Sequence, residues 1–255
     1  MSRVIGIVSG KGGVGKTTVA VNLGSALAKH HNKKVTVVDC NITTSHLGLS
    51  LGMYYWPTNL NKVLKGEVAL EDAMLEHTSG MRVLPASIKH KDITGVDLGN
   101  LRNLIKQLSK DSDVIILDAS PGLGREAMLA LNACEEVLFV AAPTIPSAID
   151  VVRCREVAED LGKTPLGIVL NQVEEKEYEL TKADVERLTG MPVISVIPRD
   201  HAVGRSLAKE IPVVMLEPKS KAGEEMLHLS SKIIGAEHKR REGFFVKLLK
   251  RLRLK

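Results

Sequence analysis

The chain has 255 residues, of which 44% are hydrophobic and 25% charged, with 35 Lys and Arg against 30 Asp and Glu. This composition allows a sizeable core and excludes a disordered chain, and the low aromatic content of 3% argues against a base-stacking nucleic-acid platform. We expect a soluble intracellular protein for three reasons. The three cysteines are widely spaced and form no CxxC pair, the N-terminus is unlike a signal peptide, and no apolar run approaches about 20 residues.

Short β-branched runs alternate with helical patterns along the chain. We expect strands at 3–8, 34–39, 81–84, 114–118, 137–142, 166–171 and 193–197, and helices at 16–29, 99–110, 145–161 and 181–189. Several strands are apolar nearly throughout, which is typical of a parallel sheet covered on both faces. The order predicts one α/β domain over residues 1–235, a doubly wound, mostly parallel sheet with helices on both faces. A short charged linker at 236–242 and a C-terminal helix at 243–255 follow it.

A phosphate-binding loop is predicted directly after the first strand, where residues 10–17 fit the pattern G-x-x-x-x-G-K-[ST] and open a helix. Glycines allow backbone N–H groups to surround phosphate oxygens, and the helix adds its positive end. Lys16 has the length to reach the β- and γ-phosphates, and the Thr17 hydroxyl is a Mg²⁺ ligand in such loops. The predicted nucleotide contacts here are Gly10, Lys11, Gly12, Gly13, Val14, Gly15, Lys16, Thr17 and Thr18. A purely structural glycine turn would not require the Lys-Thr pair.

The run from Lys11 to Thr18 contains a second lysine and resembles the deviant Walker A motif of the MinD/ParA family of ATPases. That resemblance implies ATP and Mg²⁺ as cofactors and an ATP-dependent homodimer in which Lys11 reaches the partner's nucleotide. The alternative for Lys11 is a surface lysine near phosphate. Within the family, residues 41–47 and 64–67 look similar to MinD and its archaeal relatives.

The resemblance also implies further site residues beyond the glycine loop. Asp39 ends the strand before the family's switch I, and Asp118 ends the Walker B strand before switch II. With Thr17 they are the predicted metal ligands, each carboxylate acting through water. Asn171, Pro198 and Asp200 match the adenine pocket, although an Asn at a strand end is also an ordinary turn residue.

Switch I departs from the family pattern at one position. The usual Asp-x-Asp reads Asp39-Cys40-Asn41 here, so an amide replaces the carboxylate that positions or activates the attacking water. An amide holds a water but takes no proton from it, and general-base help commonly contributes about 10²–10⁴-fold. We therefore expect an ATPase with slow hydrolysis, in which Lys11, Lys16 and Asn41 serve catalysis. The opposing view is that positioning dominates phosphoryl transfer, in which case Asn41 suffices.

The positive net charge belongs to the C-terminus. Residues 239–255 carry +7, which leaves −2 for residues 1–238 from a total of +5. An apolar stripe runs along this tail at helical spacing, and its residues are Phe244, Phe245, Leu248, Leu249 and Leu252. Twelve helical residues reach only about 18 Å, so the tail predicts a helix that lies in an anionic membrane surface and resembles the targeting helix of MinD. Packing on its own domain, or binding nucleic acid or a partner groove, are the alternatives.

Together these features predict a MinD-like switch that dimerises on ATP, binds the inner face of the cell membrane reversibly and positions a cellular structure such as the division site. One alternative is a nucleotide-gated scaffold with negligible ATPase, suggested by Asn41. Another is a ParA-like DNA-partitioning ATPase, although the scarcity of aromatics and the acidic body do not favour nucleic acid. An iron–sulfur carrier would need CxxC ligands. Tyr54, Tyr55 and Trp56 could form part of a surface for a protein partner that the sequence does not identify, or a structural plug.

Overall fold

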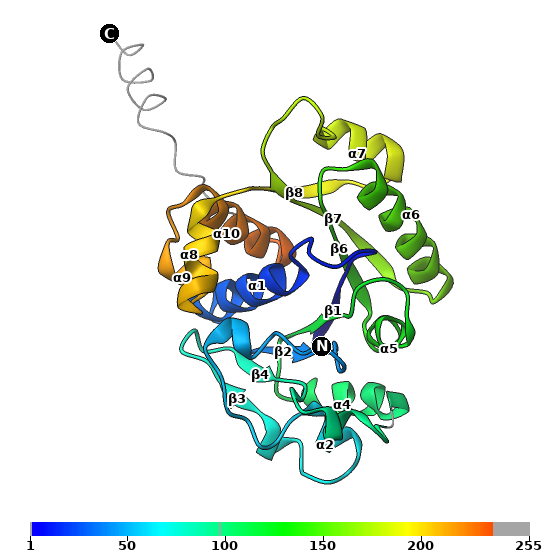
Figure 1. Cartoon of the computed structure of the whole chain (residues 1–255), viewed down its shortest axis with the longest axis vertical. Helices are drawn as coiled ribbons and strands as arrows, with labels where there is room; N and C mark the ends of the chain where they lie inside the picture. Colours follow the sequence, from blue (N-terminus) through cyan, green and yellow to red (C-terminus); the bar gives the residue numbers. More distant parts are fainter. Residues whose placement is uncertain (1, 97, 237–255) are drawn as a thin grey trace.

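A computed structural model describes residues 2–96 and 98–236 as one eight-stranded sheet with helices on both faces (Figure 1). The strands are β1 (Arg3–Val8), β2 (Val35–Asp39), β3 (Leu75–Glu76), β4 (Arg82–Leu84), β5 (Val114–Asp118), β6 (Glu136–Ala141), β7 (Thr164–Val173) and β8 (Val193–Pro198). Their order in the sheet is β3-β4-β2-β5-β1-β6-β7-β8, and only the pairing of β3 with β4 is antiparallel. The predicted fold class is confirmed.

Ten α-helices are found in the described residues. They are α1 (Lys16–His31), α2 (Leu60–Leu64), α3 (His90–Ile93), α4 (Leu101–Leu108), α5 (Arg125–Ala133), α6 (Ile145–Asp160), α7 (Lys182–Thr189), α8 (His201–Lys209), α9 (Val213–Leu216) and α10 (Lys221–Ile233). Helices α1, α8, α9 and α10 lie on one side of the sheet, and α4, α5, α6 and α7 lie on the other (Figure 1). No helix in the described part of the chain is both long and apolar enough to cross a membrane.

The apolar core has two halves because side chains of a strand alternate between faces. In β1, Val4 and Val8 pack toward α5 and α6, whereas Ile5 and Ile7 pack toward α1 and α10. Helix α1 lies very close to the sheet at Gly24, where an added Cβ would come within 2.6 Å of a Val37 methyl carbon. The central strands are buried on both faces, which explains why their sequences are apolar nearly throughout.

The predicted strands and helices all occur, and their ends differ by at most two residues, including those of the helix predicted at 99–110. That helix begins as a 3₁₀ turn at Leu98–Asn100 and continues as α4, ending at Leu108. The pattern did not predict β3, a two-residue edge strand, or helices α2, α3, α5, α8, α9 and α10. Residues 237–255, with most of the predicted linker and the whole predicted helix at 243–255, lie outside the described residues.

Candidate nucleotide-binding site

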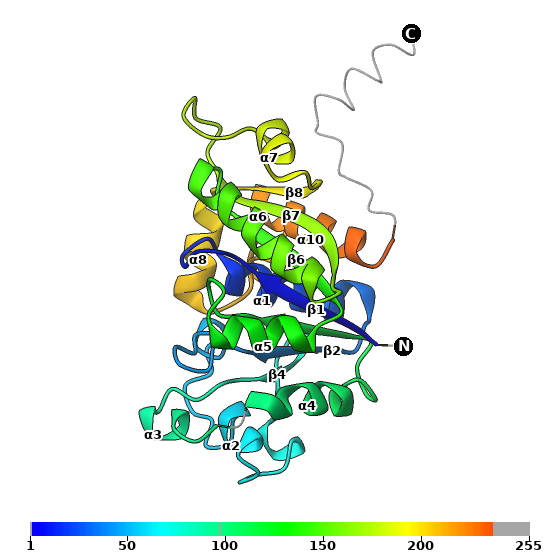
Figure 2. The ribbon, with the colours of Figure 1, turned by 90° about the vertical axis from the view of Figure 1, so that its right-hand side faces the viewer.

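The glycine loop leaves the carboxyl end of β1, a central strand with β5 and β6 as its neighbours. Residues 9–15 turn there, and α1 begins at Lys16 without a side-chain cap or an acidic residue in its first turn. In Figure 2 this loop lies on the side of the molecule opposite the N-terminus. A helix start that is uncapped and free of acids leaves its N–H groups available to an anion, as phosphate binding requires.

Two glycines of this loop cannot be replaced without moving a neighbour. Gly15 has a φ of +95°, and an added Cβ would lie 2.3 Å from Nδ2 of Asn171. An added Cβ at Gly10 would lie 2.1 Å from Cβ of Asp150 on α6. The loop is thus held between α6 on one side and β7 on the other. Because its glycines have no side chains, the backbone of the loop is available to phosphate.

Lys16 is only 7% exposed, and burial lowers the pKa of its ammonium while the carboxylate of Asp118 opposes the shift. A positive charge in a poorly solvated place is unfavourable, and binding of an anion beside it lowers that cost. This environment suits a phosphate ligand, and the role of Lys16 stays a prediction.

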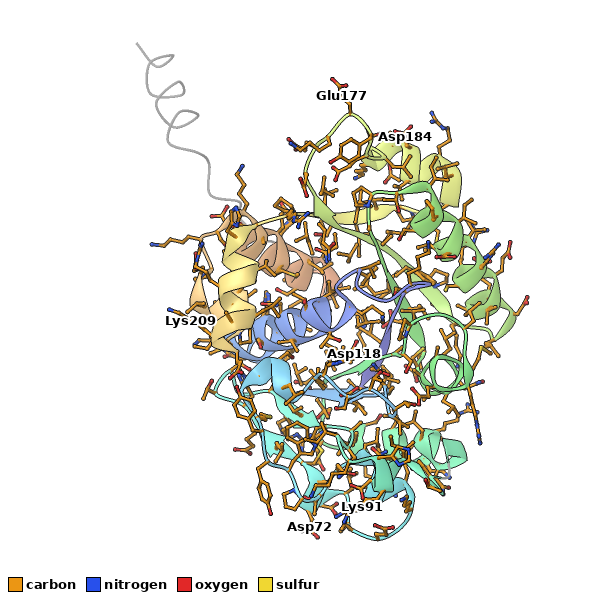
Figure 3. The ribbon with its side chains drawn as sticks, viewed as in Figure 1. Asp72, Lys91, Asp118, Glu177, Asp184 and Lys209 are labelled. Carbon is orange, nitrogen blue, oxygen red and sulfur yellow. The ribbon has the colours of Figure 1, made fainter. Side chains whose placement is uncertain are left out.

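A buried pair of carboxylates lies next to the loop, where β2 and β5 end side by side. Asp39 and Asp118 are partners in the parallel register, and both are fully or almost fully buried. Asp118 is labelled near the centre of the molecule in Figure 3. Burial raises the pKa of both side chains, and the charge of Asp39 raises that of Asp118 further. Two adjacent buried carboxylates call for a cation or a proton between them.

The surroundings of the pair indicate which oxygen is available to that cation. Thr17 donates from Oγ1 to Oδ2 of Asp118 over 2.6 Å, while Oδ1 of Asp118 is buried with no hydrogen-bond partner. Asp39 already accepts from the N–H of Asn41, the hydroxyl of Ser45 and the N–H of Leu47. A Mg²⁺ ion therefore fits best beside Thr17 and Asp118, and contact of Asp39 with it through water stays a prediction.

Replacing Asp118 with asparagine should separate stability from function. The amide keeps the shape and can still accept from Thr17, but it removes the repulsion between two buried carboxylates. We expect the nucleotide-free protein to gain about 1–4 kcal/mol in free energy of unfolding and to lose Mg²⁺-dependent nucleotide binding. Urea unfolding and nucleotide titration with and without Mg²⁺ measure both. A destabilised variant would instead show that the attraction of Asp118 for Lys16 outweighs its repulsion from Asp39.

The second lysine of the loop is exposed and loosely paired. Nζ of Lys11 lies 4.0 Å from Oδ2 of Asp150, and Arg153 lies 3.8 Å from the other oxygen of the same carboxylate. The Lys11 side chain is 54% exposed, so this pair contributes little to stability. Lys11 can therefore exchange Asp150 for another anion at small cost.

Switch I is tied to the start of α5 by a chain of polar contacts. Asn41 donates from Nδ2 to the carbonyl of Thr44 and, at Oδ1, lies 2.9 Å from the hydroxyl of Ser120. Glu126, in the first turn of α5, accepts from Ser120 and also from Thr43 of switch I. Glu126 has no local sequence signal of this role, because its approach to switch I requires the turn between β5 and α5.

The predicted base contacts line a cavity of about 1160 Å³ at the carboxyl ends of β7 and β8. Asn171, Pro198 and Asp200 all reach it, but two of them also have structural roles. Asn171 donates from Nδ2 to the carbonyl of Val14, and Asp200 caps α8 at the N–H of Ala202. The sequence predicts that Asn171 ends its strand, but β7 continues to Val173. The three adenine contacts stay predictions on residues that the structure brings to one cavity.

Comparison with known proteins supports this arrangement. Residues 5–213 match the CobQ/CobB/MinD/ParA nucleotide binding domain. An uncharacterised ATP-binding protein of Methanocaldococcus jannaschii is 33% identical over 99% of this chain and 97% of its own length. The chain belongs to the CobQ/CobB/MinD/ParA family of nucleotide-binding domains.

Solved structures of this family place the chain near MinD. The MinD of Pyrococcus horikoshii, in complex with Mg-ADP, shares 32% identity and a TM-score of 0.88 over 91% of this chain and 96% of that one. The cell division ATPase MinD of Pyrococcus furiosus shares 34% identity and a TM-score of 0.89 over 92% and 99%. The prediction of an adenine nucleotide with Mg²⁺ as cofactors of this family is confirmed.

The aromatic run beyond switch I is divided between the core and the surface. Trp56 is 6% exposed and donates from its indole nitrogen to the carbonyl of Ala86, so it plugs the core. Tyr54 and Tyr55 are 63% and 80% exposed, and Tyr54 donates its hydroxyl to Glu210. The surface reading is therefore restricted to the two tyrosines.

Proposed function

We propose that the protein is a MinD-like ATPase switch that dimerises on ATP and associates with the inner, cytoplasmic face of the cell membrane. The observation that carries the proposal is the glycine loop with two lysines of different character. Lys16 is buried beside Asp118, whereas Lys11 is exposed and only weakly paired. The first has the environment of a ligand to the bound nucleotide, and the second is available to reach a nucleotide outside its own chain.

The surface around the loop supports a second copy of the chain as the partner. Ile145 and Ile149 of α6 are 61% and 40% exposed, and Leu123 of switch II is 36% exposed. Both segments flank the loop, since Gly10 abuts Asp150 of α6 and Ser9 accepts from the N–H of Gly122. Exposed apolar side chains around a polar site are typical of a surface that becomes covered.

Mg²⁺ held by Thr17 and Asp118 would neutralise phosphate charge. The residues of this chain would bind the phosphates and position the attacking water. Lys16 and the loop backbone bind and orient the phosphates, and Lys11 adds a positive charge across the dimer. Asn41 of switch I orients a water without accepting its proton. Slow turnover gives the ATP-bound dimer a long lifetime before hydrolysis releases it.

The tail supplies the proposed membrane contact. It carries +7 and the apolar stripe from Phe244 to Leu252, while residues 1–238 carry −2. A single helix of this size binds an anionic bilayer weakly, whereas two helices joined in a dimer gain about 10²–10⁴ in avidity. ATP would therefore control membrane association by controlling dimerisation, and the cellular role would be to position a structure such as the division site.

Vesicle binding tests the proposal. Co-sedimentation with vesicles containing anionic phospholipid should be strong with ATP and Mg²⁺, weak with ADP and absent after deletion of residues 243–255. Vesicles of neutral lipid are the control for charge, and size-exclusion chromatography of the deleted chain with ATP shows that it still dimerises. Equal vesicle binding with ATP and ADP would contradict the coupling of nucleotide to membrane.

Two alternatives remain distinct in such experiments. Binding to DNA that survives deletion of the tail and falls steeply with salt would favour a ParA-like partitioning ATPase. ATP-dependent dimerisation without measurable phosphate release would favour a nucleotide-gated scaffold. The second alternative rests on Asn41, and the first on the family alone.

A further inference from the structure

A carboxylate lies one hydroxyl away from the position where switch I lacks one. Glu126 accepts at Oε2 from the Ser120 hydroxyl and at Oε1 from the Thr43 hydroxyl. The Ser120 oxygen also lies 2.9 Å from Oδ1 of Asn41. These contacts join switch I, the loop that follows β5 and the first turn of α5 through a single glutamate.

The hydrogens of this cluster can be assigned by counting donors. Oδ1 of Asn41 has a donor in the Thr44 hydroxyl at 2.9 Å, whereas Glu126 accepts only. The hydroxyl of Ser120 has one proton, and an ionised carboxylate is a stronger acceptor than an amide oxygen. The proton of Ser120 therefore belongs to Glu126, which leaves the lone pairs of the Ser120 oxygen directed elsewhere.

This assignment creates a place for a water next to Ser120. A water beside Ser120 would donate a hydrogen to the Ser120 oxygen, but it could not donate its second hydrogen to Oδ1 of Asn41, which lies only 2.9 Å from that oxygen. Its own lone pair would then be free. Ser120 is 8% exposed and lies between Asp118, the predicted metal ligand, and Gly122, whose N–H donates to the carbonyl of Ser9 at the start of the glycine loop.

We propose that Glu126 is a positioning residue that acts through Ser120 and compensates for the missing switch I carboxylate at Asn41. By holding the Ser120 proton, Glu126 makes the hydroxyl an acceptor for the attacking water. This inference rests on the proposed ATPase activity. It assigns a part in hydrolysis to the first turn of α5, which lies outside switch I.

The test is a double-mutant cycle of Glu126→Gln and Asn41→Asp, with phosphate release measured at saturating Mg-ATP. A glutamine keeps the size but cannot accept from both Ser120 and Thr43. We expect E126Q to lower kcat about tenfold with KM changed less than twofold. In the N41D background, where switch I has its own carboxylate, E126Q should change kcat less than twofold. Glu177→Gln, at the exposed tip of the loop after β7, is the matched control and should leave kcat unchanged (Figure 3).

A structural role for Glu126 gives a different pattern. It would lower kcat by the same factor in both backgrounds or lower the thermal stability of the variant, and either result would overturn the proposal. Normal turnover of E126Q in the original background would also overturn it while leaving the ATPase function intact. An unmodified chain that binds Mg-ATP and releases no phosphate would overturn both.

Discussion

Replacement of Lys16 with alanine is expected to weaken the binding of Mg-ATP about a hundredfold. The ammonium is 7% exposed beside Asp118, so it has few interactions to give up when phosphate binds and its charge acts in a poorly solvated site. Charge-assisted hydrogen bonds of this kind contribute about 1.5–3 kcal/mol, and 1.4 kcal/mol corresponds to a tenfold change in affinity. Calorimetric titration with Mg-ATP measures the loss.

Lys11→Ala is the matched control, because it removes the same group from the same loop. Its side chain is 54% exposed and 4.0 Å from Asp150, so its loss should change nucleotide affinity by no more than a few-fold. The ATP-dependent dimer should nevertheless disappear from size-exclusion profiles. If both variants lost nucleotide binding to the same extent, the division of roles between the two lysines would be wrong.

Asn41→Asp is expected to raise the rate of ATP hydrolysis about 10- to 100-fold. The change restores a carboxylate to switch I, and a positioned general base contributes about 10²–10⁴-fold, of which Asn41 already supplies the positioning part. The aspartate also loses the hydrogen bond from Nδ2 of Asn41 to the carbonyl of Thr44, at 2.8 Å, which reduces the gain. Steady-state phosphate release with and without vesicles measures the change.

Asn41→Ala controls for the lost contact, since it removes the hydrogen bonds without adding a charge. It should hydrolyse ATP no faster than the unmodified chain. An Asn41→Asp variant with unchanged turnover would show that the amide is sufficient and that phosphoryl transfer here depends on positioning alone.

Local motifs made the centre of the site predictable. The conformation of residues 10–17 can be predicted from their residue types. Glycine at position 15 allows the positive φ found there, and the Lys16-Thr17 pair of the motif marks the start of a helix. Asp39 and Asp118 each follow a buried apolar run, and parallel strands bring such ends to one edge. Their proximity therefore follows from the fold class.

Other parts of the site depend on contacts that a linear pattern does not contain. Glu126 lies far from Thr43 in sequence, and only the turn between β5 and α5 brings the two together. The sequence predicts that Asn171 ends its strand, yet β7 continues to Val173, which pairs with Pro198 of β8. Pairing with a neighbouring strand prevailed over local propensity there.

The ends of β1 determine how nucleotide and tail can communicate. Arg3, at its first residue, pairs with Glu136 and donates to the carbonyl of Ile233, the last residue of α10, whereas the glycine loop follows Val8 at the other end. Six residues of strand separate these points by about 20 Å, and Figure 2 shows the N-terminus and the end of α10 on the same side. Helix α10 therefore ends beside the amino-terminal end of β1, remote from the glycine loop. A nucleotide at the glycine loop would have no direct contact with the end of α10. In the proposed function, nucleotide would therefore control membrane binding through the number of tails in an assembly and not through a change in the individual tail.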